Sequence, residues 1–164
     1  MIHTDRIQEL NERPKKEGKY VLYWMQASQR EEYNHALEFA IKRANKQRKP
    51  LVVVLGITAA FPEANLRHYA FMLEGLREVG EALAERGVRF VVRYGPPDQV
   101  ALELAQNASL LVTDRGYFRI QKGWRRTVAE QAECPVIQVE SDIVVPVEVV
   151  SEKEEYSAAT IRPK

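Results

Sequence analysis

The fold prediction rests on one segment, Tyr20-Val-Leu-Tyr-Trp-Met-Gln-Ala-Ser-Gln-Arg30. Its first six residues form a nearly continuous apolar and aromatic run, which is typical of a strand covered on both faces. The polar residues after Met25 indicate a turn. A segment of helical period follows, with six apolar residues on one face: Tyr33, Ala36, Leu37, Ala40, Ile41 and Ala44. A buried strand leading into a helix indicates an α/β protein.

The same alternation continues along the chain. Strands are expected at 20–25, 51–56, 88–94, 109–113 and 135–139, and helices at 33–44, 66–84, 96–108 and 121–132. Strict alternation implies parallel strands joined by right-handed crossovers. We therefore predict an α/β fold, a three-layer Rossmann-like doubly wound sheet of five parallel strands with helices on both faces. Residues 20–145 would form this domain, and residues 1–19 a polar N-terminal extension.

The inward face of the long second helix is also predicted from its period. Its apolar stripe consists of Leu66, Tyr69, Ala70, Leu73, Leu76, Gly80, Leu83 and Ala84. Gly87 is expected to end this helix, because glycine adopts the left-handed conformation that often terminates helices.

Composition restricts the class of protein. The chain has 164 residues, 45% of them hydrophobic and 29% charged, and its net charge is +1. These values fit one globular domain and provide no overall electrostatic drive toward nucleic acid or membrane. A single cysteine, Cys134, excludes an internal disulfide and favours a reducing compartment. With a polar N-terminus and only short apolar runs, we expect a cytoplasmic protein with no membrane partner.

The candidate site follows from the topology, because ligands of doubly wound sheets bind outside the carboxyl ends of the strands. The first strand ends in Met25, Gln26 and Ser28, and the fourth in Asp114, Arg115, Gly116, Tyr117 and Phe118. Together they predict a pocket with a few polar groups among apolar walls. An alternative remains open, in which Gln26 and Ser28 cap the next helix and Asp114 holds its own loop.

Other motifs point to no catalytic centre. The chain has neither GxGxxG after the first strand nor GxxxxGK[ST], and its histidines, His3, His35 and His68, lack partners at metal-ligand spacing. A basic series, Arg115, Arg119, Lys122 and Arg126, would share one face if a helix began near Arg115. It could meet phosphate oxygens or an acidic partner, but we favour a solvated helix face because charge elsewhere is balanced.

Four blocks together resemble a known family. They are 20–26 with 30–36, 61–76, 114–121 with 124–126, and 139–142 leading to 160–164. In this order they resemble the N-terminal antenna-binding α/β domain of class II cyclobutane pyrimidine dimer photolyases, flavoprotein lyases of light-dependent DNA repair. The resemblance implies that Phe61 and Pro62 make a turn and that Asn65 caps the following helix.

The resemblance also implies cofactors and partners. In such enzymes a linker, here expected to start within 146–164, leads to a helical domain that binds FAD and damaged DNA. That domain would be the partner of this chain, and DNA would be contacted only through it. A deazaflavin antenna (8-HDF, also called F0) is implied at the strand ends, with folate or flavin less favoured. The implied binding residues are Met25, Gln26, Ser28, Arg30, Leu55, Gly56, Asp114 and Tyr117.

Three hypotheses follow. In the first, the chain is the antenna domain of such a photolyase and repairs no DNA by itself. In the second, it is a stand-alone small-molecule or nucleotide-binding module of the same Rossmann-like fold, an inference from fold alone. In the third, it is a structural partner whose uncovered apolar face causes weak self-association.

Overall fold

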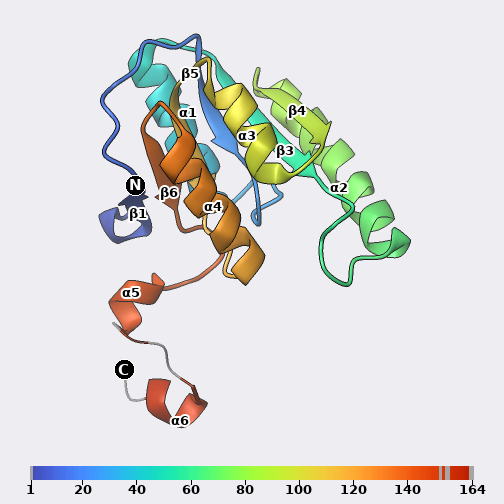
Figure 1. Cartoon of the computed structure of the whole chain (residues 1–164), viewed down its shortest axis with the longest axis vertical. Coiled ribbons are helices and arrows are strands. Elements are labelled where there is room, and N and C mark those ends of the chain that lie inside the picture. Colours follow the sequence, from blue (N-terminus) through green and yellow to red (C-terminus); the bar gives the residue numbers. More distant parts are fainter. Residues whose placement is uncertain (1, 152, 154–155, 163–164) are drawn as a thin grey trace.

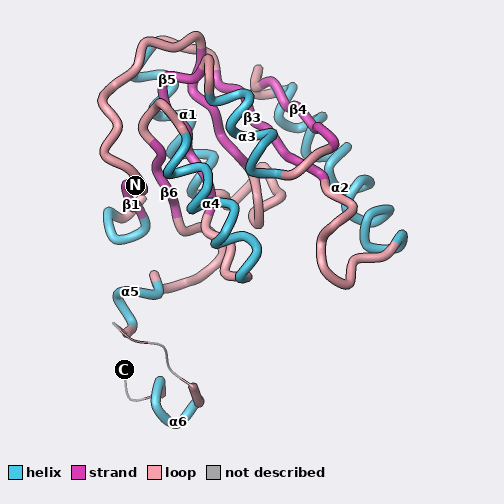
Figure 2. The backbone as a smooth tube through the Cα atoms, viewed as in Figure 1, coloured by secondary structure: helices cyan, strands magenta, loops and turns pink. Residues whose placement is uncertain are grey.

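A computed structural model describes residues 2–151, 153 and 156–162 of the chain. Figure 1 shows a twisted sheet with helices on both faces, and Figure 2 marks the same elements by type. The six strands are β1 (Ile7–Glu9), β2 (Tyr20–Trp24), β3 (Leu51–Ile57), β4 (Arg89–Tyr94), β5 (Ala108–Asp114) and β6 (Val136–Val139). Their order across the sheet is β1-β6-β5-β2-β3-β4, and β1 alone among them runs antiparallel to its neighbour.

Four long helices form the outer layers: α1 (His35–Gln47), α2 (Leu66–Glu85), α3 (Pro97–Ala105) and α4 (Arg119–Gln131). Shorter elements are a 3-10 turn, η1 (Thr4–Arg6), and two single-turn helices, α5 (Val147–Val150) and α6 (Ala158–Ile161). Helices α1 and α2 pack on one face of the sheet, and α3 and α4 pack on the other. The predicted three-layer α/β fold is therefore confirmed.

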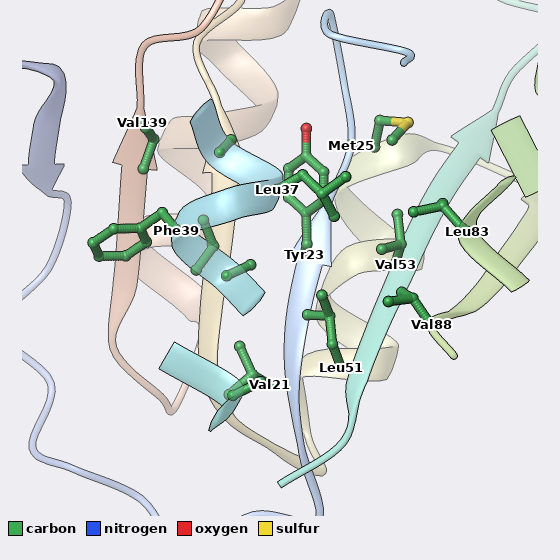
Figure 3. Close-up of a cluster of buried hydrophobic side chains, with 14 of the residues drawn as sticks. Val21, Tyr23, Met25, Leu37, Phe39, Leu51, Val53, Leu83, Val88 and Val139 are labelled. Carbon is green, nitrogen blue, oxygen red and sulfur yellow. The ribbon is translucent and has the colours of Figure 1, made fainter. Parts of the chain in front are cut away.

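Strand β2 lies at the centre of the sheet and is covered on both sides. Val21, Tyr23 and Met25 point into the core under α1 and α2, where Figure 3 shows them among the other side chains of that cluster. Leu22 and Trp24 point into the opposite core under α3 and α4. Burial on both faces explains why the sequence of this strand is apolar without alternation.

The strand count differs from the prediction of five. Strand β1 comes from the segment expected to be a polar extension, and Ile7 pairs with Val139 at the edge of the sheet. Only three residues long, β1 is stabilised mainly by backbone pairing, and two of its side chains are exposed. Such a strand leaves no apolar pattern in the sequence, which is why periodicity did not reveal it.

The start of α1 also differs from the prediction, which placed Tyr33 on its buried face. The helix begins at His35 because Asn34 caps it, with the Asn34 side chain accepting a hydrogen bond from the Leu37 amide at 3.0 Å. Tyr33 precedes the cap with a φ of 50° and is 87% exposed.

Only part of the predicted stripe of α2 is buried. Leu66 is 84% exposed and Leu73 is 50% exposed, whereas Leu76 and Leu83 pack against the sheet. Val79, which the predicted stripe left out, is buried beside them. The first turns of α2 project past the end of the sheet (Figure 1), and Leu66 and Phe71 in these turns are exposed. The predicted stop is confirmed, since α2 ends at Glu85 and Gly87 has a φ of 69°.

A close approach between β3 and α3 predicts the effect of one substitution. A Cβ atom on Gly56 would lie 2.7 Å from Cα of Pro97, so Gly56→Ala forces α3 away from the sheet. We expect the free energy of unfolding to fall by about 2 kcal/mol, a typical cost of overpacking. Urea unfolding measures the change. Gly75→Ala is the control, because a Cβ atom there meets nothing within 4 Å. Equal stability of the two variants would contradict this reading of the contact.

Candidate functional site

A cavity of about 340 Å³ lies at the carboxyl ends of β2 and β3. Its larger apolar side chains are Met25, Leu55, Ile57, Phe61, Met72, Phe118 and Trp124, and its smaller ones are Ala27, Ala64 and Pro97. Polar side chains in the lining are Gln26, Gln29, Thr58, His68, Tyr69 and Gln121. The position agrees with the topological rule, because β2 lies beside β5 where the order of the strands reverses.

The loop between β3 and α2 closes one side of this cavity. Its turn is made as predicted, with the Ala64 amide donating to the carbonyl oxygen of Phe61 at 3.2 Å. Asn65 caps α2, and Nδ1 of His68 accepts a hydrogen bond from the Asn65 amide at 3.1 Å. The hydroxyl of Tyr69 donates to the carbonyl oxygen of Thr58 at 2.7 Å. These contacts hold His68 and Tyr69 in the wall.

The predicted site residues divide into two groups. Met25, Gln26, Leu55 and Gly56 line the cavity together. The other four, Ser28, Arg30, Asp114 and Tyr117, lie outside its lining and bond to neighbouring polar groups. The aromatic wall of Phe61, Phe118 and Trp124 was not predicted as a unit. Phe61 and Trp124 come from distant parts of the chain, yet their ring centroids are 6.3 Å apart.

Asp114 holds the loop that follows β2. Its side chain is fully buried and accepts three backbone hydrogen bonds, from the amides of Gln26 at 2.9 Å, Ala27 at 3.0 Å and Ser28 at 2.6 Å. Burial raises the pKa of Asp114 from 3.8 to about 6, while these hydrogen bonds act in the opposite direction. Asp114 thus has a supporting role, as the alternative interpretation expected, but the loop that it holds is the one after β2 and not its own.

Ser28 and Arg30 connect the same loop to the chain after β6. The Ser28 hydroxyl donates to Oδ1 of Asp142 at 2.9 Å, and Nη1 of Arg30 lies 2.8 Å from that oxygen. Asn34 is the N-cap of α1, so the alternative in which Gln26 and Ser28 cap this helix is wrong.

Tyr117 contacts a buried carboxylate. Its hydroxyl donates to Oε1 of Glu140 at 2.5 Å, and Glu140 is only 2% exposed. Burial and the proximity of Glu140 raise the pKa of Tyr117 above its ordinary value. Arg115 lies 3.2 Å from the same oxygen and also pairs with Glu148. The amide of Val147 donates to the other oxygen of Glu140 at 3.2 Å.

The basic series does not form one helical face. Helix α4 begins only at Arg119, so Arg115 lies in the preceding loop with two carboxylate partners. Arg119, Lys122 and Arg126 are exposed, as a solvated face requires. Arg125 was missed as part of the site. It is buried, and its Nη1 donates to the side-chain oxygen of Gln26 at 3.2 Å.

The described part of the chain offers no sign of a membrane span or a metal centre. No helix there is long and apolar enough to span a bilayer. No group of three or more His, Cys, Asp or Glu side chains in those residues could hold a metal ion.

Comparison with known proteins adds a family to this geometry. The family model for DNA photolyase matches residues 21–164. The chain belongs to the DNA photolyase family.

Among the relatives of this photolyase-family chain is the deoxyribodipyrimidine photo-lyase of Methanothermobacter thermautotrophicus. The two are 54% identical over 165 residues, which cover 100% of this chain and 37% of that protein. The deoxyribodipyrimidine photo-lyase of Potorous tridactylus is 35% identical over 147 residues, covering 87% of this chain and 28% of the relative. The photolyase-family chain therefore spans about a third of the length of these relatives.

A solved structure supports the fold of this photolyase-family chain. It is a protein of unknown function from Pseudomonas aeruginosa, matched with a TM-score of 0.54 at 18% sequence identity. The match covers 83% of this chain and 52% of that protein. At this identity the similarity concerns the fold alone.

Proposed function

We propose that this chain is the antenna domain of a class II cyclobutane pyrimidine dimer photolyase. It binds a flat chromophore, 8-HDF, in the cavity at the strand ends. The observation that carries the proposal is the cavity itself. Phe61, Phe118 and Trp124 offer ring faces to a planar ligand, and Met25 and Met72 add polarizable sulfur. The volume of about 340 Å³ falls within the range of small-molecule sites.

The charge of the lining favours this chromophore over a phosphorylated nucleotide. None of the described residues that line the cavity is Lys, Arg, Asp or Glu. Arg125 lies outside the lining and donates to the side chain of Gln26. His68 uses Nδ1 as an acceptor from the Asn65 amide, so this nitrogen is not available to a ligand. Phosphate groups are ordinarily held by cationic side chains or by clustered backbone amides. A ring system without phosphate groups therefore fits better than the phosphorylated nucleotide of the alternative, stand-alone module.

The proposal assigns light absorption to this domain and DNA repair to a second domain of the parent chain. A bound antenna absorbs light and passes the excitation energy to the flavin of the repair reaction. We assign FAD and damaged DNA to a helical domain of the same parent chain, which is the proposed partner of this domain. The share of the relatives that is matched, 37% and 28%, leaves room for such a domain. Weak self-association remains a prediction, for which exposed Leu66, Phe71 and Tyr94 offer apolar surface.

Titration of the purified protein with 8-HDF tests the proposal. We expect saturable binding, a shifted ligand absorption spectrum and quenching of tryptophan emission, because Trp124 lines the cavity. Ala64→Trp fills the cavity and should abolish binding. Ala60→Trp, in the same loop but exposed and outside the lining, should preserve it.

Three results would contradict the proposal. They are no binding of 8-HDF by the folded protein, equal binding by the two tryptophan variants, and light-dependent repair of dimer-containing DNA by these 164 residues alone.

A further inference from the structure

One polar side chain in the cavity wall, Gln26, has a hydrogen-bond donor without a partner among the described residues. The side-chain amide of Gln26 accepts a hydrogen bond from Nη1 of Arg125 through Oε1, at 3.2 Å. Nε2 of the same amide is buried and has no partner among the described residues. Leaving a buried donor unpaired is costly, so an incoming acceptor at this position would be favoured.

Arg125 determines which way the Gln26 amide faces. A guanidinium group only donates hydrogen bonds, so it selects the orientation with Oε1 toward Arg125 and Nε2 away from it. Arg125 is 7% exposed and forms no ion pair within the described part of the chain, which leaves Gln26 as its side-chain hydrogen-bond partner there. Burial lowers the pKa of Arg125, although a guanidinium stays charged under all ordinary conditions.

The other buried donor without a partner has a different setting. Nε1 of Trp24 is also unpaired in the described structure, but Trp24 packs in the core beneath α3 and α4 and does not line the cavity. Gln26 is therefore the side chain that combines an unpaired donor with a place in the cavity wall.

We propose that Gln26 selects the ligand by donating from Nε2 to a hydrogen-bond acceptor on the edge of a flat aromatic ring system. Arg125 is the positioning residue that fixes the amide for this contact. The inference rests on the proposed function, because it places the ligand in the same cavity. It adds a chemical requirement, namely a ring carbonyl oxygen or ring nitrogen at the edge that meets Gln26. A purely hydrocarbon ring of equal size would leave Nε2 unpaired.

Binding of 8-HDF to matched variants tests the contact. Gln26→Leu removes the donor while keeping the size of the side chain, and its dissociation constant should rise about tenfold. Gln26→Glu should weaken binding at least as much, because it offers a second acceptor in place of the donor. Gln131→Leu is the control for the same chemical change, since Gln131 is exposed near the end of α4 and outside the lining.

A double-mutant cycle tests the positioning role of Arg125. Arg125→Met should weaken 8-HDF binding several-fold, since it leaves the amide free to turn. Adding Gln26→Leu to Arg125→Met should then cost less than it does in the wild-type background. Infrared spectra give an independent readout. The carbonyl stretch of bound 8-HDF should lie at lower frequency in the wild-type protein than in Gln26→Leu. Thermal melting verifies that each variant is folded.

The outcomes separate this inference from the proposed function. Weaker binding by Gln26→Leu together with loss of the carbonyl shift supports the inference. Binding of 8-HDF with unchanged affinity and an unchanged carbonyl stretch in folded Gln26→Leu overturns it and leaves the antenna function standing. If the wild-type protein binds no 8-HDF, both are overturned.

Discussion

Replacing Asp114 with alanine is expected to lower the free energy of unfolding by about 3 kcal/mol at pH 7.5, because buried amide donors lose their acceptors. The carboxylate accepts hydrogen bonds from the amides of Gln26, Ala27 and Ser28, and no part of its side chain is exposed. The loop it supports carries Met25 and Gln26 into the cavity wall. We therefore expect 8-HDF binding to be lost along with stability.

Urea unfolding followed by circular dichroism measures this effect. Asp114→Asn is the informative control, because asparagine keeps one acceptor oxygen and carries no charge. We expect it to lose only about 1 kcal/mol, since at least one backbone hydrogen bond is retained. If the alanine and asparagine variants were equally stable, the acceptor oxygens would not be what holds the loop.

The stability of the protein should also depend on pH through Asp114. Its pKa is raised from 3.8 to about 6 in the folded state, mainly by burial. Between pH 4 and pH 6 the folded protein therefore holds a proton on Asp114 that the unfolded chain has already lost. The free energy of unfolding falls as pH rises through this window, and the contribution of Asp114 amounts to about 3 kcal/mol.

The measurement is a series of urea unfolding curves from pH 4 to pH 8 for the wild-type protein and Asp114→Asn. Other carboxyl groups titrate in both proteins and cancel in the difference. We expect the stability of the wild-type protein relative to the variant to decrease with rising pH and to level off above pH 7. A constant difference across the series would show that Asp114 titrates at its ordinary pKa.

The sequence predicted the central fold because burial leaves a pattern in it. Strand β2 is covered on both faces, so its apolar run was unmistakable, and the helical period of α1 and α4 follows from packing on one side. Strand β1 left no such pattern, because its backbone pairing with β6 depends little on side chains. The start of α2 shows the opposite case. Its apolar residues recur at helical spacing, yet Leu66 there is exposed.

The candidate site was predictable in place but not in composition. The rule on strand ends located Met25, Gln26, Leu55 and Gly56, which meet in the cavity. Ser28, Arg30, Asp114 and Tyr117 are polar residues at the same edge, but they lie outside the lining. Asp114 accepts from backbone amides of the loop after β2, Ser28 and Arg30 bond to Asp142, and Tyr117 bonds to Glu140. The aromatic wall joins residues far apart along the chain, and one sequence has no period that reports such contacts.

The polar contacts after β6 have a mechanical consequence. Arg6 donates to the carbonyl oxygen of Ile143 at 2.9 Å, and Arg115 pairs with Glu148. A pull on the backbone near residue 150 therefore strains these surface bonds before it reaches the sheet. Asp142 is the next residue toward β6 with such a contact. Its hydrogen bond with Ser28 would transmit the remaining force to the loop beside the cavity. The hydrogen bond between Ser28 and Asp142 thus connects the chain after β6 to the loop beside the cavity.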